Sequence, residues 1–290
     1  MKRKILYLCT IFICSIMLTG CFESDTMKNI KIKTSVYPIE YITTFLYKNN
    51  AEIIGSIYPD GINLSKYTLT DKQIKDFSNN DLFIYNGTSN EPDYAIKLLN
   101  TNKNIKIIDA AKGMEYDNGV EELWLDPFNF LMLAENIKNG LSDYIKDPYL
   151  TEEIEKKFDE LNLEASELDV KIKEAAEHAV NKTILVSNDV FKYLEKYDIN
   201  VISLEENENL NEKIIDDAKD LIKDGTIEYL FIKNDEEQNE TIKKLVSSTN
   251  VTVVPIHSLS ILSEKERTDN MDYITLMENN IEKIRKELYK

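Results

Sequence analysis

The sequence predicts an α/β protein of two lobes, each a mainly parallel four-stranded sheet flanked by helices, with one long rigid helix joining them. Three observations predict this fold. Short strand-like runs alternate with helical patterns in both halves of the chain, a long stretch without glycine or proline separates the halves, and an amphipathic segment closes the sequence.

The N-terminus has the pattern of a signal peptide. Three basic residues, Lys2, Arg3 and Lys4, precede an apolar run of about 13 residues, which is too short to span a bilayer. Residues 18–21 read Leu-Thr-Gly-Cys, which resembles the lipobox of bacterial lipoproteins, whose cysteine receives a diacylglycerol before cleavage. We therefore expect removal of residues 1–20, lipidation of Cys21 and a flexible tether over residues 21–29; an ordinary signal peptide that ends near a cysteine is the alternative.

Residues 30–148 form the predicted N-terminal lobe. Helical patterns, with apolar residues three or four apart, separate β-branched or apolar runs that predict strands. The strands are expected at residues 30–36, 52–58, 81–87 and 104–110, and the helices between them at residues 39–49, 71–77 and 93–99.

Residues 149–180 form the predicted connecting helix. Its apolar residues fall on one stripe between residues 151 and 179, and Thr151 followed by Glu152 and Glu153 suits a helix N-terminus. Some 28 residues would extend roughly 42 Å, long enough to run along the whole molecule. A helical connector predicts lobes that move little relative to each other, with a coiled coil as the alternative interpretation of this stretch.

Residues 181–290 form the predicted C-terminal lobe, which repeats the alternating scheme. Strands are expected at residues 183–187, 200–204, 229–233 and 250–256, and helices at residues 189–196, 212–223 and 240–246. A final amphipathic helix over residues 271–288 should close back over the core.

Composition excludes several kinds of function. With 52 acidic and 35 basic residues the net charge is −17, which repels nucleic acid and anionic headgroups. Cys9 and Cys14 lie in the expected signal peptide and Cys21 is the expected lipid attachment point, so the body has no cysteine for disulfides, thiolate metal sites or nucleophilic catalysis. We expect a monomer that binds no nucleic acid.

Five stretches, in the same order, resemble segments of the solute-binding lipoproteins of zinc and manganese ABC importers. They are YPDGINLSKY at residues 58–67, DLFIYNG at 81–87, WLDP at 124–127, VSNDVFKYL at 186–194 and MDYITLMENN at 271–280. The resemblance covers nearly all of residues 30–290. It implies a receptor on the outer face of the bacterial cell membrane that delivers a small solute or metal ion to an ABC permease and catalyses nothing.

The same resemblance implies a changed metal site. The family holds its metal with three histidines and a carboxylate, whereas Ser65, Glu122 and Asn188 stand at the histidine positions and His257 stands where the carboxylate is expected. Because zinc prefers imidazole, thiolate and carboxylate ligands, a hydroxyl and an amide predict a degenerate site that binds Zn²⁺ or Mn²⁺ weakly, if it coordinates anything.

Further candidates flank these positions. The carboxylates of Glu121, Asp189 and Asp60 either add oxygen ligands or face solvent. Aromatic residues near the expected lobe interface either line a cleft for an organic ligand or pack the lobes together; they are Tyr37, Tyr67, Tyr85 and Trp124. The other histidine, His178, is expected at a helix end on the surface.

Two functions therefore remain open. The leading interpretation is an extracellular solute-binding lipoprotein of an ABC importer with a degenerate metal site. The alternative is a surface adhesion or binding lipoprotein that has lost metal binding. An enzyme is not expected, because the sequence has no glycine-rich phosphate loop, nucleophile elbow or His-Glu-x-x-His motif.

Overall fold

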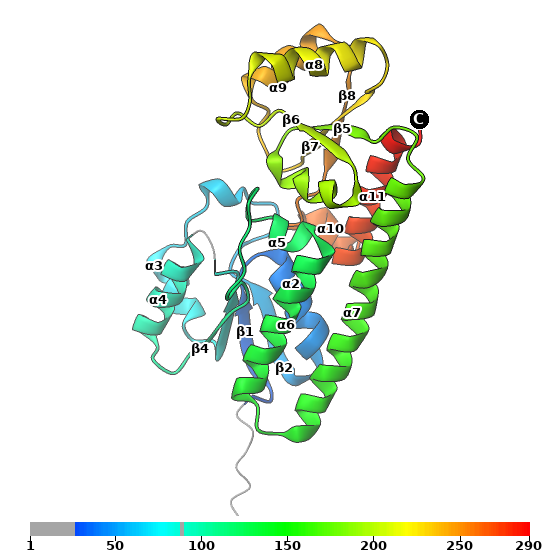
Figure 1. The fold of residues 1–290 in the computed structure, drawn as a ribbon. Coiled ribbons are helices and arrows are strands. Elements are labelled where there is room, and N and C mark those ends of the chain that lie inside the picture. The colour runs from blue at the N-terminus through cyan, green and yellow to red at the C-terminus, as the bar shows by residue number, and fades with distance from the viewer. Residues whose placement is uncertain (1–26, 88–89) are drawn as a thin grey trace, which may run out of the picture.

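The computed structural model describes residues 27–87 and 90–290, and the expected signal peptide and Cys21 lie outside these ranges. Two parallel four-stranded sheets, each flanked by helices, form two lobes, and the long helix α7 runs beside both of them (Figure 1). The predicted fold class is confirmed.

The first sheet has the strand order β2-β1-β3-β4, with every neighbouring pair parallel. The order reverses between β1 and β3, so the loops that follow these two strands leave toward opposite faces of the sheet. The strands are β1 (Ile30–Thr34), β2 (Ala51–Ser56), β3 (Leu82–Tyr85) and β4 (Lys106–Asp109); the helices are α2 (Tyr37–Tyr47), α3 (Asp71–Phe77), α4 (Glu91–Thr101) and α6 (Pro127–Tyr144), with short 3-10 turns at η1 (Lys48–Asn50) and η2 (Leu64–Lys66).

The second sheet repeats this topology in the order β6-β5-β7-β8, again all parallel. Its strands are β5 (Thr183–Val186), β6 (Asn200–Ser203), β7 (Tyr229–Lys233) and β8 (Thr252–Ile256), and its helices are η3 (Asp189–Tyr197), a 3-10 helix, with α8 (Glu212–Lys223) and α9 (Glu240–Ser248). The reversal here lies between β5 and β7, so both lobes have the point at which open α/β sheets bind ligands.

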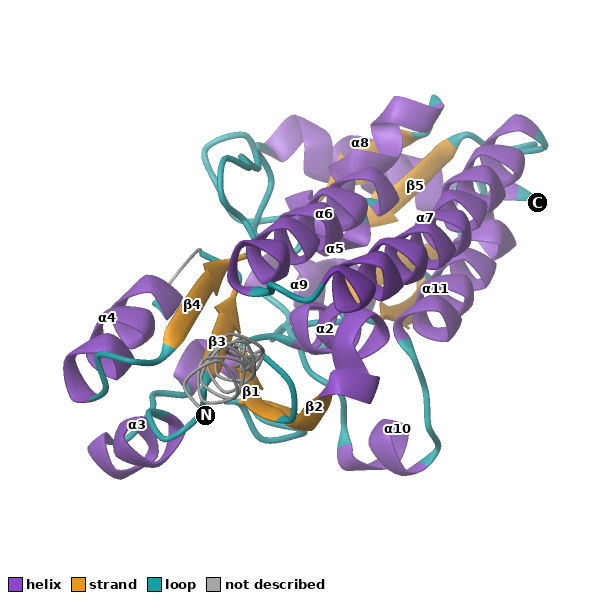
Figure 2. Ribbon diagram, turned by 90° about the horizontal axis from the view of Figure 1, so that it is seen from below, coloured by secondary structure: helices purple, strands orange, loops and turns teal. Residues whose placement is uncertain are grey.

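Helix α7 (Pro148–Glu177) packs against α6 and against the last helix, α11 (Tyr273–Leu288), and Figure 2 shows these three side by side. Its buried stripe includes Leu161, Ala165 and Leu168, as the apolar spacing predicted. The expected N-terminus at Thr151 is wrong. Asp147 caps the helix by accepting a hydrogen bond from the Tyr149 backbone amide at 2.9 Å, which an Asp-Pro start favours.

The last residues of the expected tether belong to the folded body. Met27 is fully buried, its carbonyl accepts a hydrogen bond from the Tyr47 hydroxyl, and Lys28 lies 2.5 Å from Asp147. The expected boundary at residue 30 therefore lies too late in the chain. None of the helices in the described ranges is long and apolar enough to cross a membrane.

Two short helices were not predicted, and both lie where the lobes meet. Helix α5 (Glu122–Leu125) precedes α6, and α10 (Glu264–Thr268) follows β8. Backbone hydrogen bonds join the segment before α10 to the first lobe, from Tyr37 to Ser260 at 2.9 Å and from Gly61 to Leu262 at 2.8 Å. The two lobes are thus attached through loops as well as through α7.

Candidate functional site

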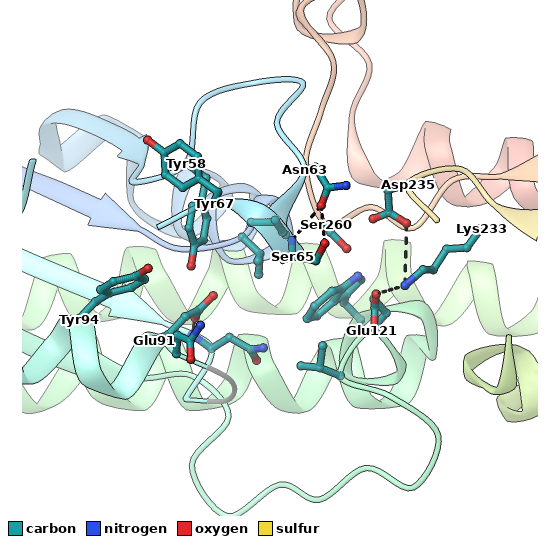
Figure 3. Close-up of a pocket in the computed structure, with 16 residues that line it drawn as sticks. Tyr58, Asn63, Ser65, Tyr67, Glu91, Tyr94, Glu121, Lys233, Asp235 and Ser260 are labelled. Atoms are coloured by element: carbon teal, nitrogen blue, oxygen red, sulfur yellow. Dashed lines mark hydrogen bonds and ion pairs between the residues drawn. The ribbon is translucent and has the colours of Figure 1, made fainter. Parts of the chain in front are cut away.

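A polar cavity of about 290 Å³ lies between the lobes, close to the carboxyl ends of strands from both sheets (Figure 3). The first lobe contributes Asn86 from the end of β3 and Ser65 from η2, while the second contributes Lys233 from the end of β7 and Ser260 from the loop after β8. The cavity therefore occupies the place where doubly wound sheets commonly bind ligands.

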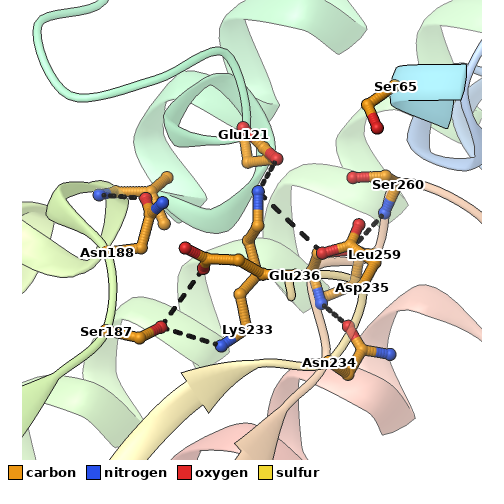
Figure 4. Close-up of polar contacts among 12 residues, drawn as sticks. Ser65, Glu121, Ser187, Asn188, Lys233, Asn234, Asp235, Glu236, Leu259 and Ser260 are labelled. Carbon is orange, nitrogen blue, oxygen red and sulfur yellow. Dashed lines mark hydrogen bonds and ion pairs between the residues drawn. The ribbon is translucent and has the colours of Figure 1, made fainter. Parts of the chain in front are cut away.

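Lys233 is the cationic group of this cavity. Its Nζ lies 2.5 Å from Glu121 Oε1 and 3.9 Å from Asp235 Oδ1, and only 16% of its side chain is exposed (Figure 4). Burial disfavours the charged ammonium, but the adjacent Glu121 carboxylate more than offsets this and raises the pKa of Lys233. A permanent positive charge is therefore fixed at the second-lobe end of the cavity.

Of the four residues expected at metal-ligand positions, Ser65 lines the cavity and Glu122 does not. The Ser65 hydroxyl donates a hydrogen bond to Asn63 Oδ1 at 2.7 Å, which also accepts from the Ser65 backbone amide. Glu122 accepts hydrogen bonds from the Asn118 backbone amide at 3.1 Å and from the Asn118 side chain at 3.2 Å. Its carboxylate is thus used to hold the preceding loop.

Asn188 and His257 also have local partners. Asn188 caps η3 by accepting a hydrogen bond from the Val190 amide at 3.0 Å. His257 is buried, its Nδ1 accepts a hydrogen bond from the Leu259 amide at 2.9 Å, and its Nε2 lies 3.2 Å from Glu266 of α10. Burial lowers the pKa of His257 more than Glu266 raises it, so the imidazole is held neutral.

The four positions do not form one cluster. No hydrogen bond joins any two of them, and His257 borders a separate, more open depression together with Glu266. Within residues 27–87 and 90–290, no three histidine, cysteine, aspartate or glutamate side chains are grouped so as to hold a metal ion. The donor set present does not fit zinc, which needs three or four such ligands.

Each of the three neighbouring carboxylates is paired with a basic residue. Glu121 contacts Lys233, Asp189 contacts Lys192 at 2.8 Å, and Asp60 accepts hydrogen bonds from Arg267 at 2.9 and 3.2 Å. Basic side chains of the protein thus contact the carboxylates that the sequence analysis named as possible additional metal ligands.

The aromatic candidates divide into two pairs. Tyr67 and Trp124 line the cavity. Tyr37 lies beneath the Arg267 guanidinium, 5.7 Å from its ring centre, and Tyr85 stacks on Phe83 at 5.5 Å. These two residues pack the fold instead. His178 lies at the exposed end of α7, where Nδ1 is 2.9 Å from the Glu174 carbonyl oxygen.

Sequence reasoning missed several residues that line the cavity. They include Tyr58, Glu91, Tyr94, Lys233 and Asp235. A usable signal existed for Lys233, because a lysine that ends a buried strand of a parallel sheet lies at the ligand-binding edge. Glu91 gave a weaker signal, since acidic residues are common in the first turn of a helix for reasons unrelated to ligands.

A cavity between two α/β lobes that are joined by a long helix is typical of the class of two-lobed binding proteins. The family model for "Zinc-uptake complex component A periplasmic" matches residues 32–287, and the chain belongs to this family. The family model is named for zinc uptake and the relative AdcA for zinc binding, which agrees with the expectation that the chain is not an enzyme.

Individual relatives are distant. The zinc-binding protein AdcA of Streptococcus pyogenes is 23% identical over 98% of this chain, which spans only 61% of that protein's length. The manganese ABC transporter substrate-binding lipoprotein PsaA of Streptococcus pneumoniae is 28% identical over 99% of this chain and 100% of its own. The zinc-bound ZnuA-like domain of S. pneumoniae AdcA superposes with a TM-score of 0.72 at 21% identity, covering 90% of this chain and 100% of that domain. At this identity the structural match defines the fold alone.

Proposed function

We propose that this protein is an extracytoplasmic solute-binding lipoprotein of an ABC importer, lipid-anchored through Cys21, in which an internal ion pair has replaced the family's metal site. The observation that carries the proposal is the contact between Lys233 and Glu121 inside the cleft. The proposed partners are a membrane permease and its cytoplasmic ATPase, as in the relatives named as ABC transporter components.

The ion pair argues against tight metal binding on electrostatic grounds. A divalent cation in this cavity would lie close to a fixed ammonium, and Glu121 would have to leave that ammonium before it could bind the metal. Ser65 lines the cavity and Asn188 caps η3, and both provide only neutral oxygens, which compensate poorly for the hydration shell that a transition metal loses. We therefore propose that Zn²⁺ and Mn²⁺ bind weakly or not at all.

Calorimetric titration of the metal-stripped chain tests this proposal. The protein lacks residues 1–20 and carries Cys21→Ser so that it stays free of lipid. We expect no saturable heat with zinc or manganese at micromolar protein and no rise in Tm. Lys233→Met should bind zinc more tightly than the parent, whereas Lys66→Met, which removes an exposed ion pair, should not. A micromolar or tighter zinc Kd in the parent chain would contradict the proposal.

The lipid anchor has its own test. Mass spectrometry of the N-terminal peptide should find a diacylglycerol on Cys21, and Cys21→Ala should move the protein from the membrane fraction to the soluble fraction. Unmodified Cys21 in membrane-bound protein would exclude the anchor.

The second candidate is a surface adhesion or binding lipoprotein that has lost metal binding, and the same ion pair favours it. Deletion of the gene distinguishes the two. A transport receptor predicts a defect in uptake of its solute, and an adhesion lipoprotein predicts unchanged uptake with reduced attachment to a surface.

A further inference from the structure

Glu91 places a carboxylate in the cavity wall away from Lys233 (Figure 3). It is the first residue of α4, and only 4% of its surface is exposed. The Asn86 backbone amide donates a hydrogen bond to it at 2.8 Å, and the Ser35 and Tyr58 hydroxyls are its other partners. All three donors are neutral, and Glu91 forms no ion pair with any lysine, arginine or histidine of the described ranges.

An uncompensated charge at this depth is unusual, because burying a carboxylate without a cation is costly. The other three carboxylates near the site, Glu121, Asp189 and Asp60, each have a basic partner. Glu91 is therefore the acidic group in the cavity wall whose counter-charge the protein does not provide.

Aromatic rings also line the cavity. Tyr58 and Tyr67 meet edge to face with ring centres 5.9 Å apart, and Tyr94 and Trp124 complete the aromatic lining. Figure 3 shows Tyr58, Tyr67 and Tyr94 on the same side as Glu91, with Lys233, Glu121 and Asp235 on the other. Electron-rich aromatic rings beside a carboxylate favour ammonium groups.

The charge of the whole cavity also favours a cationic occupant. Glu91, Glu121 and Asp235 are acidic lining residues, and Lys233 is the basic one. Lys233 is already committed to Glu121 and Asp235, so an incoming anion would have to displace them. A cavity of about 290 Å³ lies near the lower limit of ligand pockets and admits only a small molecule.

We propose that this cavity binds a small organic cation, an amine whose ammonium lies between Glu91 and the tyrosines. This inference rests on the proposed role as a solute-binding protein, and it names the chemical class of the solute. One carboxylate with neighbouring aromatic rings suffices for a single ammonium, whereas a transition metal needs three or more ligand side chains, which the described ranges do not group together.

Proton competition follows from the same geometry. The pKa of Glu91 is raised to about 7, because burial and, to a lesser extent, the Asp109 carboxylate raise it by more than the hydrogen bonds from Asn86, Ser35 and Tyr58 lower it. The amine requires the charged carboxylate, so its binding strengthens as the pH rises from 6 to 8, where an alkylammonium keeps its own proton.

The test uses three probes of equal chain length and different charge: n-butylammonium, n-butanol and n-butyrate. Trp124 is the single tryptophan of the chain and lines the cavity, so its fluorescence reports occupancy directly. We expect n-butylammonium to bind at least tenfold more tightly than n-butanol, n-butyrate to bind more weakly than either, and the n-butylammonium Kd to fall between pH 6 and pH 8.

Glu91→Gln tests the carboxylate, since it keeps the shape and removes the charge; n-butylammonium binding should weaken at least tenfold. Glu52→Gln is the matched control, because Glu52 is exposed on β2 and does not line the cavity. This variant should bind n-butylammonium as tightly as the parent chain does. The probe series in the parent chain needs no variant, so the inference stays testable if Glu91→Gln fails to fold.

Equal affinity for n-butylammonium and n-butanol, or unchanged binding in Glu91→Gln, would overturn the inference. A zinc titration of the same sample separates it from the proposed function. Tight zinc binding would contradict the proposed loss of the metal site. If neither zinc nor n-butylammonium binds, only the inference of an amine ligand is wrong, and the proposed function stands.

Discussion

Lys233 and Glu121 are only 16% and 15% exposed, so each has lost most of its hydration and depends on the other for compensation. Lys233→Met removes the ammonium and leaves Glu121 and Asp235 together with no cation between them. We expect it to lower the free energy of unfolding by about 2 kcal/mol in urea titrations at pH 7.

The matched control is Lys66→Met. Its ion pair with Glu237 is also short, at 2.7 Å against 2.5 Å for Lys233 and Glu121, but the two side chains are 68% and 83% exposed. Exposed pairs contribute about 0–1 kcal/mol, so this variant should remain close to the parent. Equal destabilisation by both substitutions would mean that burial does not govern the strength of the Lys233 pair.

His257 should make stability depend on pH. Burial lowers its pKa below that of an unfolded histidine, so the unfolded chain binds the proton more readily. The stabilisation is complete above the ordinary histidine pKa of about 6.5 and is lost as the pH falls through the folded value. Between pH 7 and pH 5 the parent chain should lose more stability than His257→Asn does.

Urea titrations at several pH values measure this difference. His178→Asn is the control, because His178 lies exposed at the end of α7 and should leave the pH profile of the parent unchanged. If His257→Asn had the parent's profile, the neutral imidazole would contribute nothing to the pH dependence.

The site could be predicted only in part from single residues. Ser65, Tyr67 and Trp124 were singled out by their place in sequence motifs, and these three line the cavity. The contact between Lys233 and Glu121 joins positions 112 residues apart, which no local pattern encodes. Motif spacing therefore located the region of the cleft but not the charge pairing that changes its chemistry.

The Arg267 side chain of helix α10 contacts the first lobe. Arg267 forms two hydrogen bonds of 3.0 Å with the Glu40 carboxylate and two more, at 2.9 and 3.2 Å, with Asp60. A guanidinium can make both forked contacts at once, and an ammonium cannot. Arg267→Lys should therefore destabilise the protein by about 1 kcal/mol and increase amide exchange in α10.

Arg285→Lys provides the comparison, because Arg285 pairs with Glu282 within one helix at the surface. Its effect should be near zero. Hydrogen exchange followed by mass spectrometry measures the opening of α10 directly, and unchanged exchange in Arg267→Lys would show that the backbone bonds of residues 260 and 262 hold the segment alone.

Regular elements were predictable where burial dictates the pattern. The strand expected at residues 229–233 is β7, and the helix expected at residues 212–223 is α8. Helix α10 was not predicted, because it has five residues and none is buried, so its sequence shows no hydrophobic periodicity. Its capping box, Ser263 with Glu266, was present in the sequence and was the available signal.

At the scale of the molecule, the lobes are joined by α7, by the Arg267 contacts and by side-chain bonds between the lobes. Trp124 Nε1 donates a hydrogen bond to the Ser258 carbonyl at 2.8 Å, and the Tyr273 hydroxyl donates to the Trp124 carbonyl at 2.6 Å. We expect small-angle scattering to give the same radius of gyration with and without saturating n-butylammonium.

A decrease in the radius of gyration on addition of ligand would contradict this rigidity. Arg267→Lys, which loosens one attachment and leaves α7 intact, serves as the comparison. If its radius also stays constant, α7 and the loop contacts suffice to fix the lobes.

The position of α11 has a consequence for how the protein is made. This helix packs on α7 and on β5, Leu288 is fully buried, and the Leu288 carbonyl accepts hydrogen bonds from the backbone amides of Val180 and Asn181. The start of β5 is therefore covered by a helix that is synthesised after every strand of this lobe. Until α11 has been synthesised, this lobe is unfinished and open to proteases, which favours chaperone protection of the growing chain.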